Sequence, residues 1–574
     1  MQDERELQAL SFEVKSVNFK RNSVFIIGLI LSAIVAVWAI AFNQNFSIVA
    51  NSLFAFFTVD FAWLYLLTVT VFVVFGIVIA ASKWGKIKLG PDDSTPDYST
   101  VSWFAMLFGC GMGIGLVFYG VAEPISHYVS PTAGIDPMTD AAANFAMRAS
   151  YIHWGIHPWS CFVIVGLALA YFQFRKGKPG LISSTLIPLL GEEKTKGFWG
   201  KLCDMLAVFA TIAGICTSLG LGTMQINSGL NYMFGVPSTL VVQIGIIIII
   251  SVIYIGTAIL GIEKGISVVS NLNLYLAVGV MALAFIIGPK IEILNNLVGG
   301  VGNYLQTFID DSLMLDGYGD NSWVIAWRVF YWAWWVAWAP FVGSFIARIS
   351  RGRTIREFVV GVLLVPSVAS IIWFAIMGSA GLHLATTGVL DGDSLTAIAA
   401  STETAVFAVF QHYPLGILVC VIILVLVCTF FVTSANSGTF VLAMLTSRGN
   451  LNPPNSRKLL WGIVQSSLAI GLLLAGGLKP LQTISIVAAF PFMLVMIAMM
   501  VAIVKALSTD AETPNVGDEN FLPDPDMVAF DAGFGSADEA EEAGKLKELM
   551  DEATAAHGYA SQMKSDTENA AAQA

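Results

Sequence analysis

Long uninterrupted apolar runs dominate this chain. Runs of about 20 residues recur between residues 24 and 505, and short polar segments separate them. A helix of this length crosses a hydrocarbon core of about 30 Å. The apolar positions are continuous rather than alternating, which favours helices over strands. The pattern therefore predicts an all-α integral membrane protein with about 12 transmembrane helices, each of which satisfies its own backbone hydrogen bonds.

The polar segments divide the chain into six regions. Residues 1–22 and 506–574 form the terminal tails, and the second tail is acidic. Residues 289–320 link two groups of spans and contain a segment that either lies along the membrane interface or forms an ordinary loop. The three membrane regions are 23–83 with two peripheral spans over 24–42 and 53–82, 102–288 with five spans, and 321–505 with five spans.

Basic residues are confined to alternate loops, and loops rich in lysine and arginine lie on the cytoplasmic side of a membrane. The residues that predict this orientation are Lys83, Lys86, Lys88, Arg175, Lys176, Lys178, Arg348, Arg351, Arg353, Arg356, Arg448, Arg457 and Lys458. The N-terminal tail is also basic next to the first span, and an even number of spans returns the chain to the same side. Both termini are therefore expected in the cytoplasm.

Composition narrows the classes of function. Charged residues make up 12% of the chain and the mean hydropathy is +0.75, whereas a soluble domain is usually about 25% charged. The net charge of −11 arises largely in the tail after Lys505. No basic stripe is visible, so nucleic-acid binding is not expected. No nucleophile–base pair or metal-ligand spacing is visible either, so an enzyme is not expected.

Four glycines interrupt the third predicted span, at Gly109, Gly111, Gly113 and Gly115. Each weakens a helix by about 1 kcal/mol relative to alanine. Close helix packing through small residues is one explanation. The other is an unwound segment, where free N–H groups meet an anion and free C=O groups hold a cation. The position of the glycines in the middle of the span favours the unwound segment.

Tryptophans concentrate in two predicted spans. The eighth span holds Trp334, Trp335 and Trp338 at spacings of three and four, so they share a helix face. The fourth span adds Trp154 and Trp159. Several indole faces suit a cation that has no N–H to donate, and each ring contributes about 0.5–2 kcal/mol. A lipid-facing or packing stripe is the alternative, because the sequence does not show which way the rings point.

Polar side chains within the spans are few. Thr433 and Ser434 are adjacent hydroxyls, which either suit a sodium site with backbone carbonyls or bond back to their own helix. Glu123 precedes a proline at the outer end of its span and is not expected to relay protons. His153 and His157 are expected to pack or to form hydrogen bonds.

Two long motifs resemble the betaine/choline/carnitine transporter family. Residues 111–115 (GMGIG) and 118–124 (FYGVAEP) resemble its third-helix signature. Residues 331–343 (YWAWWVAWAPFVG) and 347–353 (ARISRGR) resemble its eighth-helix signature. The resemblance covers roughly residues 20–505 and is closest to the sodium-coupled carriers of glycine betaine and other compatible solutes.

The resemblance implies an architecture and an assembly. Residues 102–288 and 321–505 would be two five-helix repeats of inverted topology, which follow the two peripheral helices. Family members are often homotrimers, so a homotrimer in the inner (plasma) membrane of a bacterial cell is expected.

The resemblance also implies a substrate site. Its aromatic box maps to four rings, those of Trp154, Trp159, Phe162 and Trp335. Trp334 and Trp338 would line the inward path. Betaine carriers have a tyrosine where this chain has Phe162, so the ring face is kept and a hydroxyl is lost. Backbone N–H groups for a substrate carboxylate would come from the unwound glycines, Gly111, Gly113 and Gly115.

Sodium ligands follow from the same resemblance. The main site of the family maps to carbonyl and hydroxyl oxygens of Gly109, Met112, Phe430, Thr433 and Ser434. A second family site maps to Thr211 and Phe341, but Ile215 replaces its other threonine, so one oxygen ligand is missing. The sodium-independent exchangers of the family hold a fixed positive side chain instead of sodium. None is seen near Thr433, so symport is expected.

The expected substrate is a zwitterion, because choline members carry an aspartate where this chain has Gly115. The predicted function is sodium-coupled symport of a compatible solute into the cell for osmoprotection. Glycine betaine is the first candidate, followed by ectoine, proline and carnitine. Besides the coupling sodium ion no cofactor is expected, and the expected partners are the osmolyte, membrane lipid and further copies of the chain. Sodium-independent exchange, and a sensor or channel that binds the osmolyte without transporting it, are the alternatives.

Overall fold

The computed structural model describes residues 22–111, 113–260, 263–450, 453–518, 540–541 and 544–553. Within this part of the chain, eleven helices are long and apolar enough to cross a membrane, and a bent pair of helices makes a twelfth. The described residues contain no strand. The predicted all-α membrane fold with about 12 spans is therefore confirmed. Met112 and most of both predicted tails lie outside the described residues.

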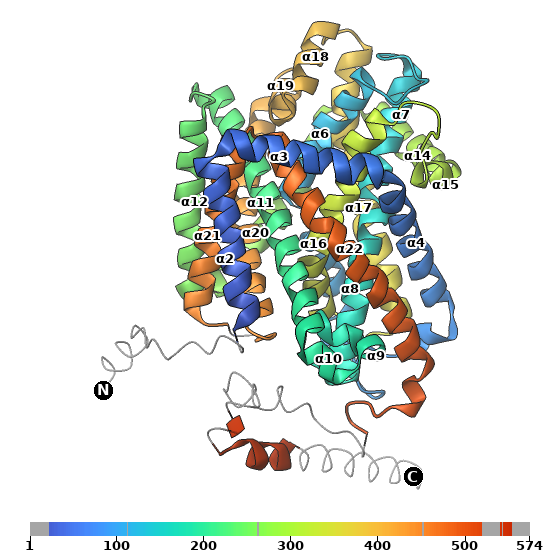
Figure 1. Ribbon diagram of the computed structural model, residues 1–574. Coiled ribbons are helices and arrows are strands. Elements are labelled where there is room, and N and C mark those ends of the chain that lie inside the picture. Colours follow the sequence, from blue (N-terminus) through green and yellow to red (C-terminus); the bar gives the residue numbers. More distant parts are fainter. Residues whose placement is uncertain are drawn as a thin grey trace.

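The long helices form one bundle, and most of them run from one end of it to the other (Figure 1). They are α2 (Ser23–Ala41), α4 (Ala62–Ala81), α5 (Thr100–Gly111), α6 (Ile114–Val129), α7 (Asp140–Trp154), α8 (Ile156–Ala170), α11 (Phe198–Phe234), α12 (Leu240–Leu260), α13 (Glu263–Ile287), α16 (Phe330–Arg348), α17 (Ile355–Thr386), α20 (Gly416–Leu445), α21 (Asn455–Leu474) and α22 (Leu478–Ser508). The shorter helices are α3 (Asn43–Ala55), α9 (Ile187–Leu190), α10 (Glu192–Lys196), α14 (Lys290–Gln306), α15 (Phe308–Ser312), α18 (Gly392–Ala400) and α19 (Ala405–Phe410).

The second predicted span, over 53–82, is shorter in the structure and begins at Ala62. Residues Phe56–Asp60 before it form a short π-helix that continues from the separate helix α3, and α3 lies across one end of the bundle (Figure 1). The polar side chains of α3 explain this position, because they find partners at the end of the bundle. Asn45 accepts from Trp38 Nε1 at 3.0 Å, and Ser47 donates to the Ala475 carbonyl at 2.6 Å.

Helices α8 and α16 pack along each other at the centre of the bundle, and α11 and α22 cover α16. In the span formed by α7 and α8, 94% of the most apolar stretch is buried, against 22% in α2, α12 and α13. Helix α2 is thus one of the least buried spans, and the predicted division into two peripheral spans and two repeats stays a prediction. Because α8 and α16 carry most of the tryptophans singled out above, a lipid-facing tryptophan stripe is excluded for these helices.

An ion-pair cluster joins distant segments at one end of the bundle. Arg175 ends the π-helix η3 (Tyr171–Arg175) and donates to both carboxylate oxygens of Asp510 at 2.7–3.1 Å. It also donates to Asp92 at 2.8 Å and to the Gly90 carbonyl at 3.1 Å. Asp510 follows α22 directly, so this cluster holds the end of the last span against the loop that follows α4.

Candidate functional site

Two spans are interrupted near their middle, each at a glycine. Gly113 precedes α6 with φ −146° and ψ −174°, and the helix axes on either side differ by 64°. Gly155 separates α7 from α8 with φ −87° and ψ −131°. A helix that begins inside the bundle has first-turn N–H groups without partners in its own helix. At α8 the Tyr304 hydroxyl accepts one of them, the Ile156 N–H, at 3.3 Å.

The glycines of the third span differ in their surroundings. A Cβ at Gly109 or Gly113 would meet no atom within 4 Å, so both positions border open space. A Cβ at Gly115 would lie 2.5 Å from Trp334 Cη2 and 3.1 Å from Trp154 Cη2. Gly115 therefore serves close packing, whereas the surroundings of Gly113 suit an unwound segment.

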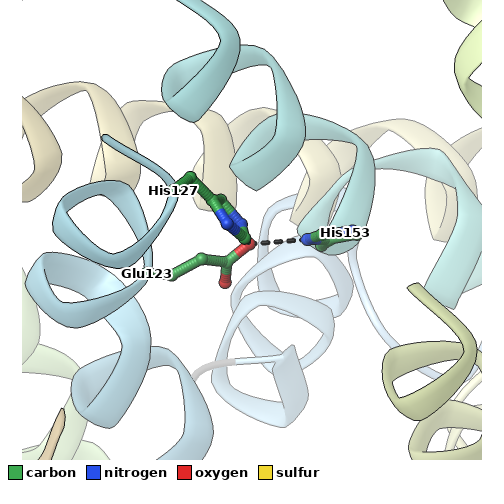
Figure 2. A group of neighbouring side chains, drawn as sticks. All are labelled: Glu123, His127 and His153. Carbon is green, nitrogen blue, oxygen red and sulfur yellow. Dashed lines mark hydrogen bonds and ion pairs between the residues drawn. The ribbon is translucent and has the colours of Figure 1, made fainter. Parts of the chain in front are cut away.

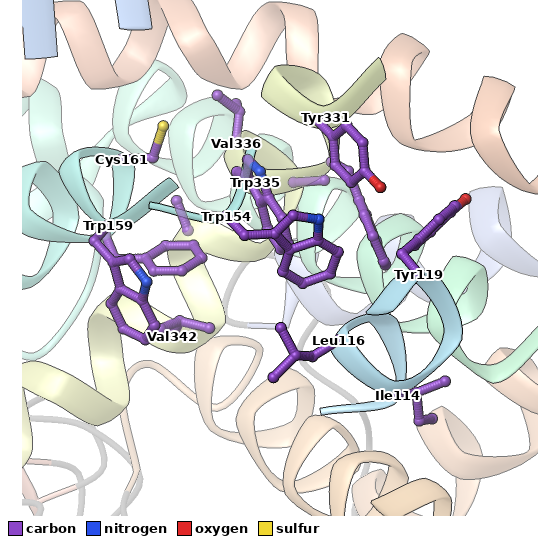
Figure 3. Packing of buried hydrophobic residues seen from close by; sticks show 14 of the residues in the cluster. Ile114, Leu116, Tyr119, Trp154, Trp159, Cys161, Tyr331, Trp335, Val336 and Val342 are labelled. Carbon is purple, nitrogen blue, oxygen red and sulfur yellow. The ribbon is translucent and has the colours of Figure 1, made fainter. Parts of the chain in front are cut away.

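The four rings predicted as an aromatic box come together from α7, α8 and α16, and Figure 3 labels three of them, Trp154, Trp159 and Trp335. The ring centroids of Trp154 and Trp335 lie 4.9 Å apart with an angle of 76° between the rings. Phe162 joins the other two rings edge-on, 5.3 Å from Trp159 and 6.4 Å from Trp335. All four side chains are at most 9% exposed. Helix packing thus brings the four rings together edge-to-face inside the bundle.

Two further tryptophans of α16, Trp334 and Trp338, lie beside this box rather than within it. Trp334 is buried and stacks on Trp335 at 5.0 Å and on Phe330 at 5.5 Å. Trp338 is half-buried, and its Nε1 donates to the Gly214 carbonyl of α11 at 3.1 Å. The predicted role of both rings on an inward path stays a prediction.

Next to the box, the carboxylate of Glu123 binds polar side chains from α6, α7 and α16, and Figure 2 shows the two histidines among them. Glu123 Oε1 lies 3.2 Å from His127 Nε2 and 2.6 Å from His153 Nδ1. Its Oε2 accepts from Trp154 Nε1 at 2.8 Å and from the Tyr331 hydroxyl. Glu123 and both histidines are fully buried. The carboxylate thus touches a ring of the aromatic box directly.

Comparison with known proteins decides the family. Residues 23–512 match the family described as BCCT, betaine/carnitine/choline family transporter. The chain belongs to this family. It is 46% identical over 491 residues to the glycine betaine transporter OpuD of Bacillus subtilis (strain 168), which covers 85% of this chain and 95% of the relative. It is 42% identical over 489 residues to the ectoine/hydroxyectoine transporter of Virgibacillus pantothenticus, which covers 85% of this chain and 96% of the relative. The protein is thus a BCCT transporter that crosses the membrane several times, and it is not an enzyme.

The hydroxyl region predicted to bind sodium in this BCCT transporter lies on α20. Thr433 Oγ1 is 3.1 Å from the Thr429 carbonyl, 3.2 Å from the Phe430 carbonyl and 3.2 Å from Asn273 Nδ2. The bond back to its own helix, one of the two alternatives, is therefore present. Ser434 is half-buried beside Thr433.

The two residues proposed for a second sodium site lie on α11 and α16, which pack together. Thr211 is 1% exposed, and its hydroxyl has no hydrogen-bond partner among the described residues. Phe341 is half-buried and meets Trp338 edge-on at 5.3 Å. The Ile215 side chain packs against Gly438, and the second sodium site stays a prediction.

Three histidines of this BCCT transporter lie deep in the bundle. His153 and His157 were expected to pack or to form hydrogen bonds, and His157 does both: it stacks on Trp332 at 5.0 Å and bonds Ser312 Oγ at 2.8 Å. The sequence pattern did not single out His127 as a partner of Glu123. Its only signal is the spacing of four residues, which places both on one face of α6. Glu123 itself is wholly buried inside α6, and not at an outer end of the span.

Proposed function

We propose that this BCCT transporter couples inward sodium movement to uptake of a zwitterionic compatible solute, with glycine betaine as the first candidate. The observation that carries the proposal is the convergence of Trp154, Trp159, Phe162 and Trp335 inside the bundle. A quaternary ammonium has no N–H to donate, so it gains most from ring faces, at about 0.5–2 kcal/mol for each. Ectoine, proline and carnitine share the zwitterionic character and are further candidates.

The carboxylate of such a solute needs its own partner. Backbone N–H groups at the glycine break between α5 and α6 suit this role, because the start of a helix favours an anion. Gly111 and Gly113 lie at the break, and the open space beside Gly113 leaves room for a ligand. Gly115 contributes by allowing two indoles to approach the start of α6. The glycine betaine and ectoine transporters among the relatives support this class of solute.

For the coupling ion we assign Gly109, Met112, Phe430, Thr433 and Ser434 to one sodium site. Neutral hydroxyl and carbonyl oxygens are suitable ligands for a hard cation. The unpartnered Thr211 hydroxyl supports a second ion near Phe341, although Ile215 supplies no oxygen there. The sequence has no fixed positive side chain beside Thr433 that could replace a sodium ion, which supports symport over exchange.

The proposed setting is the plasma membrane of a bacterial cell, with both termini in the cytoplasm. Three of the basic loops meet at one end of the bundle, which supports this orientation. Leu89 N–H donates to the Arg353 carbonyl at 2.8 Å, and Arg175 donates to the Gly90 carbonyl at 3.1 Å. We also propose that residues 102–288 and 321–505 form two inverted repeats, and that the transporter assembles as a homotrimer.

The decisive experiment is uptake into proteoliposomes. Labelled glycine betaine should accumulate only under an inward sodium gradient, and equal uptake with potassium in place of sodium would refute the coupling. Uptake that needs preloaded solute would show an exchanger. A sodium current without solute transport would show a channel.

A matched pair of variants tests the box itself. Trp335→Leu removes a ring that contributes about 0.5–2 kcal/mol, so the solute should bind about 2- to 30-fold more weakly. Trp199→Leu is the control, because Trp199 is 55% exposed and lies outside the box. Equal affinities in both variants would contradict the proposed site.

A further inference from the structure

The partners on the far side of two histidines decide where the imidazole protons lie. The Trp323 indole N–H can only donate and lies 3.3 Å from His127 Nδ1, so His127 donates to Glu123 through Nε2. The Arg328 Nε–H can only donate and lies 3.4 Å from His153 Nε2, so His153 donates to Glu123 through Nδ1. Both imidazoles are then neutral donors to an ionised carboxylate.

The charges behind this carboxylate alternate. Arg328 lies 3.9 Å from Asp311 Oδ1, and Asp311 Oδ2 lies 3.0 Å from Arg148 Nε. Glu123 and Asp311 thus supply two negative charges, and Arg328 and Arg148 supply two positive ones. A buried charge that is paired and hydrogen-bonded persists where an isolated one would not. Glu123 is therefore held as an anion inside the bundle.

A metal ion is a poor occupant of this cluster, although Glu123, His127 and His153 offer ligand atoms within 4.8 Å of one another. The direct N···O contacts of 2.6 and 3.2 Å on one carboxylate oxygen leave no room for an ion between them (Figure 2). The Arg328 guanidinium beside His153 would also repel a cation. The cluster is instead a hydrogen-bonded anchor.

We infer that Glu123 is a positioning residue of the substrate site, an inference that rests on the proposed function. It fixes Trp154 through the indole N–H and Tyr331 through the hydroxyl. Tyr331 stacks on Trp335 with centroids 6.0 Å apart, and Trp335 Nε1 donates to the His153 carbonyl at 3.0 Å. One carboxylate thereby determines how two walls of the aromatic box face each other.

The anion also changes the ring that it holds. A hydrogen bond from an indole N–H to a carboxylate pushes electron density into the ring, because charged acceptors polarise their donors. The π face of Trp154 becomes more negative and attracts a cation more strongly. Glu123 therefore favours substrates with a positive headgroup without touching them. Its own negative charge is satisfied by hydrogen bonds from four donors.

Glu123→Gln tests this role, because glutamine keeps the shape but turns an NH2 group toward groups that are themselves donors. The dissociation constant of glycine betaine, measured by tryptophan fluorescence, should rise roughly tenfold or more, while the turnover number should change much less. Trp154→Phe keeps a ring and loses the N–H. If Glu123 acts through this bond, then Glu123→Gln should weaken binding much less in the Trp154→Phe background than in the natural chain.

Asp204→Asn is the matched control, since Asp204 is also a buried acid, but its carboxylate accepts from the Ser183 backbone N–H and hydroxyl and contacts none of the four rings of the box in the described part of the chain. It should leave the affinity unchanged, and an equal loss in both variants would overturn the inference. So would inhibition by zinc ions that Glu123→Gln abolishes, because that would indicate a metal site. If Glu123→Gln does not fold, Trp154→Phe alone gives the test, and an unaltered affinity in that variant overturns the inference.

A readout without solute separates this inference from the proposed function. In protein labelled with 5-fluorotryptophan, the fluorine resonance of Trp154 should shift or broaden in Glu123→Gln and stay in place in Asp204→Asn. An unmoved Trp154 resonance overturns the positioning role, whatever the solute. A wild type that binds none of the four candidate solutes, with a Trp154 resonance that still moves, would instead overturn the proposed function.

Discussion

A single methyl group at Gly115 is expected to disturb the substrate site. The Cβ of Gly115→Ala would lie 2.5 Å from Trp334 Cη2 and 3.1 Å from Trp154 Cη2, against 3.4–4 Å for ordinary contact. Both atoms belong to rigid indoles that are nearly fully buried. The rings cannot rotate away without displacing their neighbours, because interiors are close-packed.

The size of the effect follows from this overlap. Overpacking a buried position costs about 1–3 kcal/mol. Alanine in place of glycine stabilises the helix by up to about 1 kcal/mol, but this gain does not strengthen solute binding. Since Trp154 is a wall of the aromatic box, a strain that moves this ring should weaken solute binding by roughly 5- to 100-fold.

The assay is a fluorescence titration with glycine betaine in detergent, combined with thermal unfolding of the same samples. Gly245→Ala in α12 is the control, because a Cβ there meets no atom within 4 Å. This control should bind as the natural protein does. Natural affinity and natural stability in Gly115→Ala would show that the two indoles do not press on α6, and the geometry of the site would have to be abandoned.

Three further predictions concern the proposed sodium site, the ion pair between Arg175 and Asp510, and the break between α7 and α8. Thr433→Val keeps the shape of the side chain and loses its oxygen, so the sodium concentration for half-maximal uptake should rise at least about tenfold, whereas Thr429→Val should leave it unchanged. Asp510→Asn breaks the buried pair with Arg175 and should cost about 3 kcal/mol in thermal or denaturant unfolding. Burial raises the pKa of Asp510, but the hydrogen bonds from Arg175 outweigh this effect and hold the pKa below its usual value. The stabilisation by the pair is therefore present above about pH 4 and is lost as the pH falls further. Unfolding of the natural protein and of Asp510→Asn across that pH range checks the sign. Tyr304→Phe removes the acceptor at the start of α8 and should lower the unfolding free energy by about 1–3 kcal/mol, and an unchanged melting temperature would contradict the proposed cap.

Much of the fold followed from the sequence alone. Apolar runs of about 20 residues are long enough to span a membrane, and this constraint is local, so the number of spans could be counted from the chain. Where the local signal was ambiguous, the prediction was less accurate. The run over 53–82 is apolar at both ends, yet only Ala62–Ala81 crosses as one helix, because α3 finds polar partners across the end of the bundle.

In the candidate site, the sequence identifies individual residues, whereas the tertiary structure decides which of them are in contact. Trp154 and Trp335 could be proposed from composition, spacing and family motifs, because an aromatic residue in a span is visible in the sequence. Their contact, with ring centroids 4.9 Å apart, is a property of tertiary packing, and no local pattern encodes a contact between residues so far apart in the chain.

Glu123 shows what only the tertiary structure decided. In the sequence it is an acid before a proline, which indicates the outer end of a span. The structure surrounds it with donors from α6, α7 and α16. The physical reason is that the cost of a buried charge depends on partners that packing assembles, and packing joins segments whose distance along the chain carries no record of that contact.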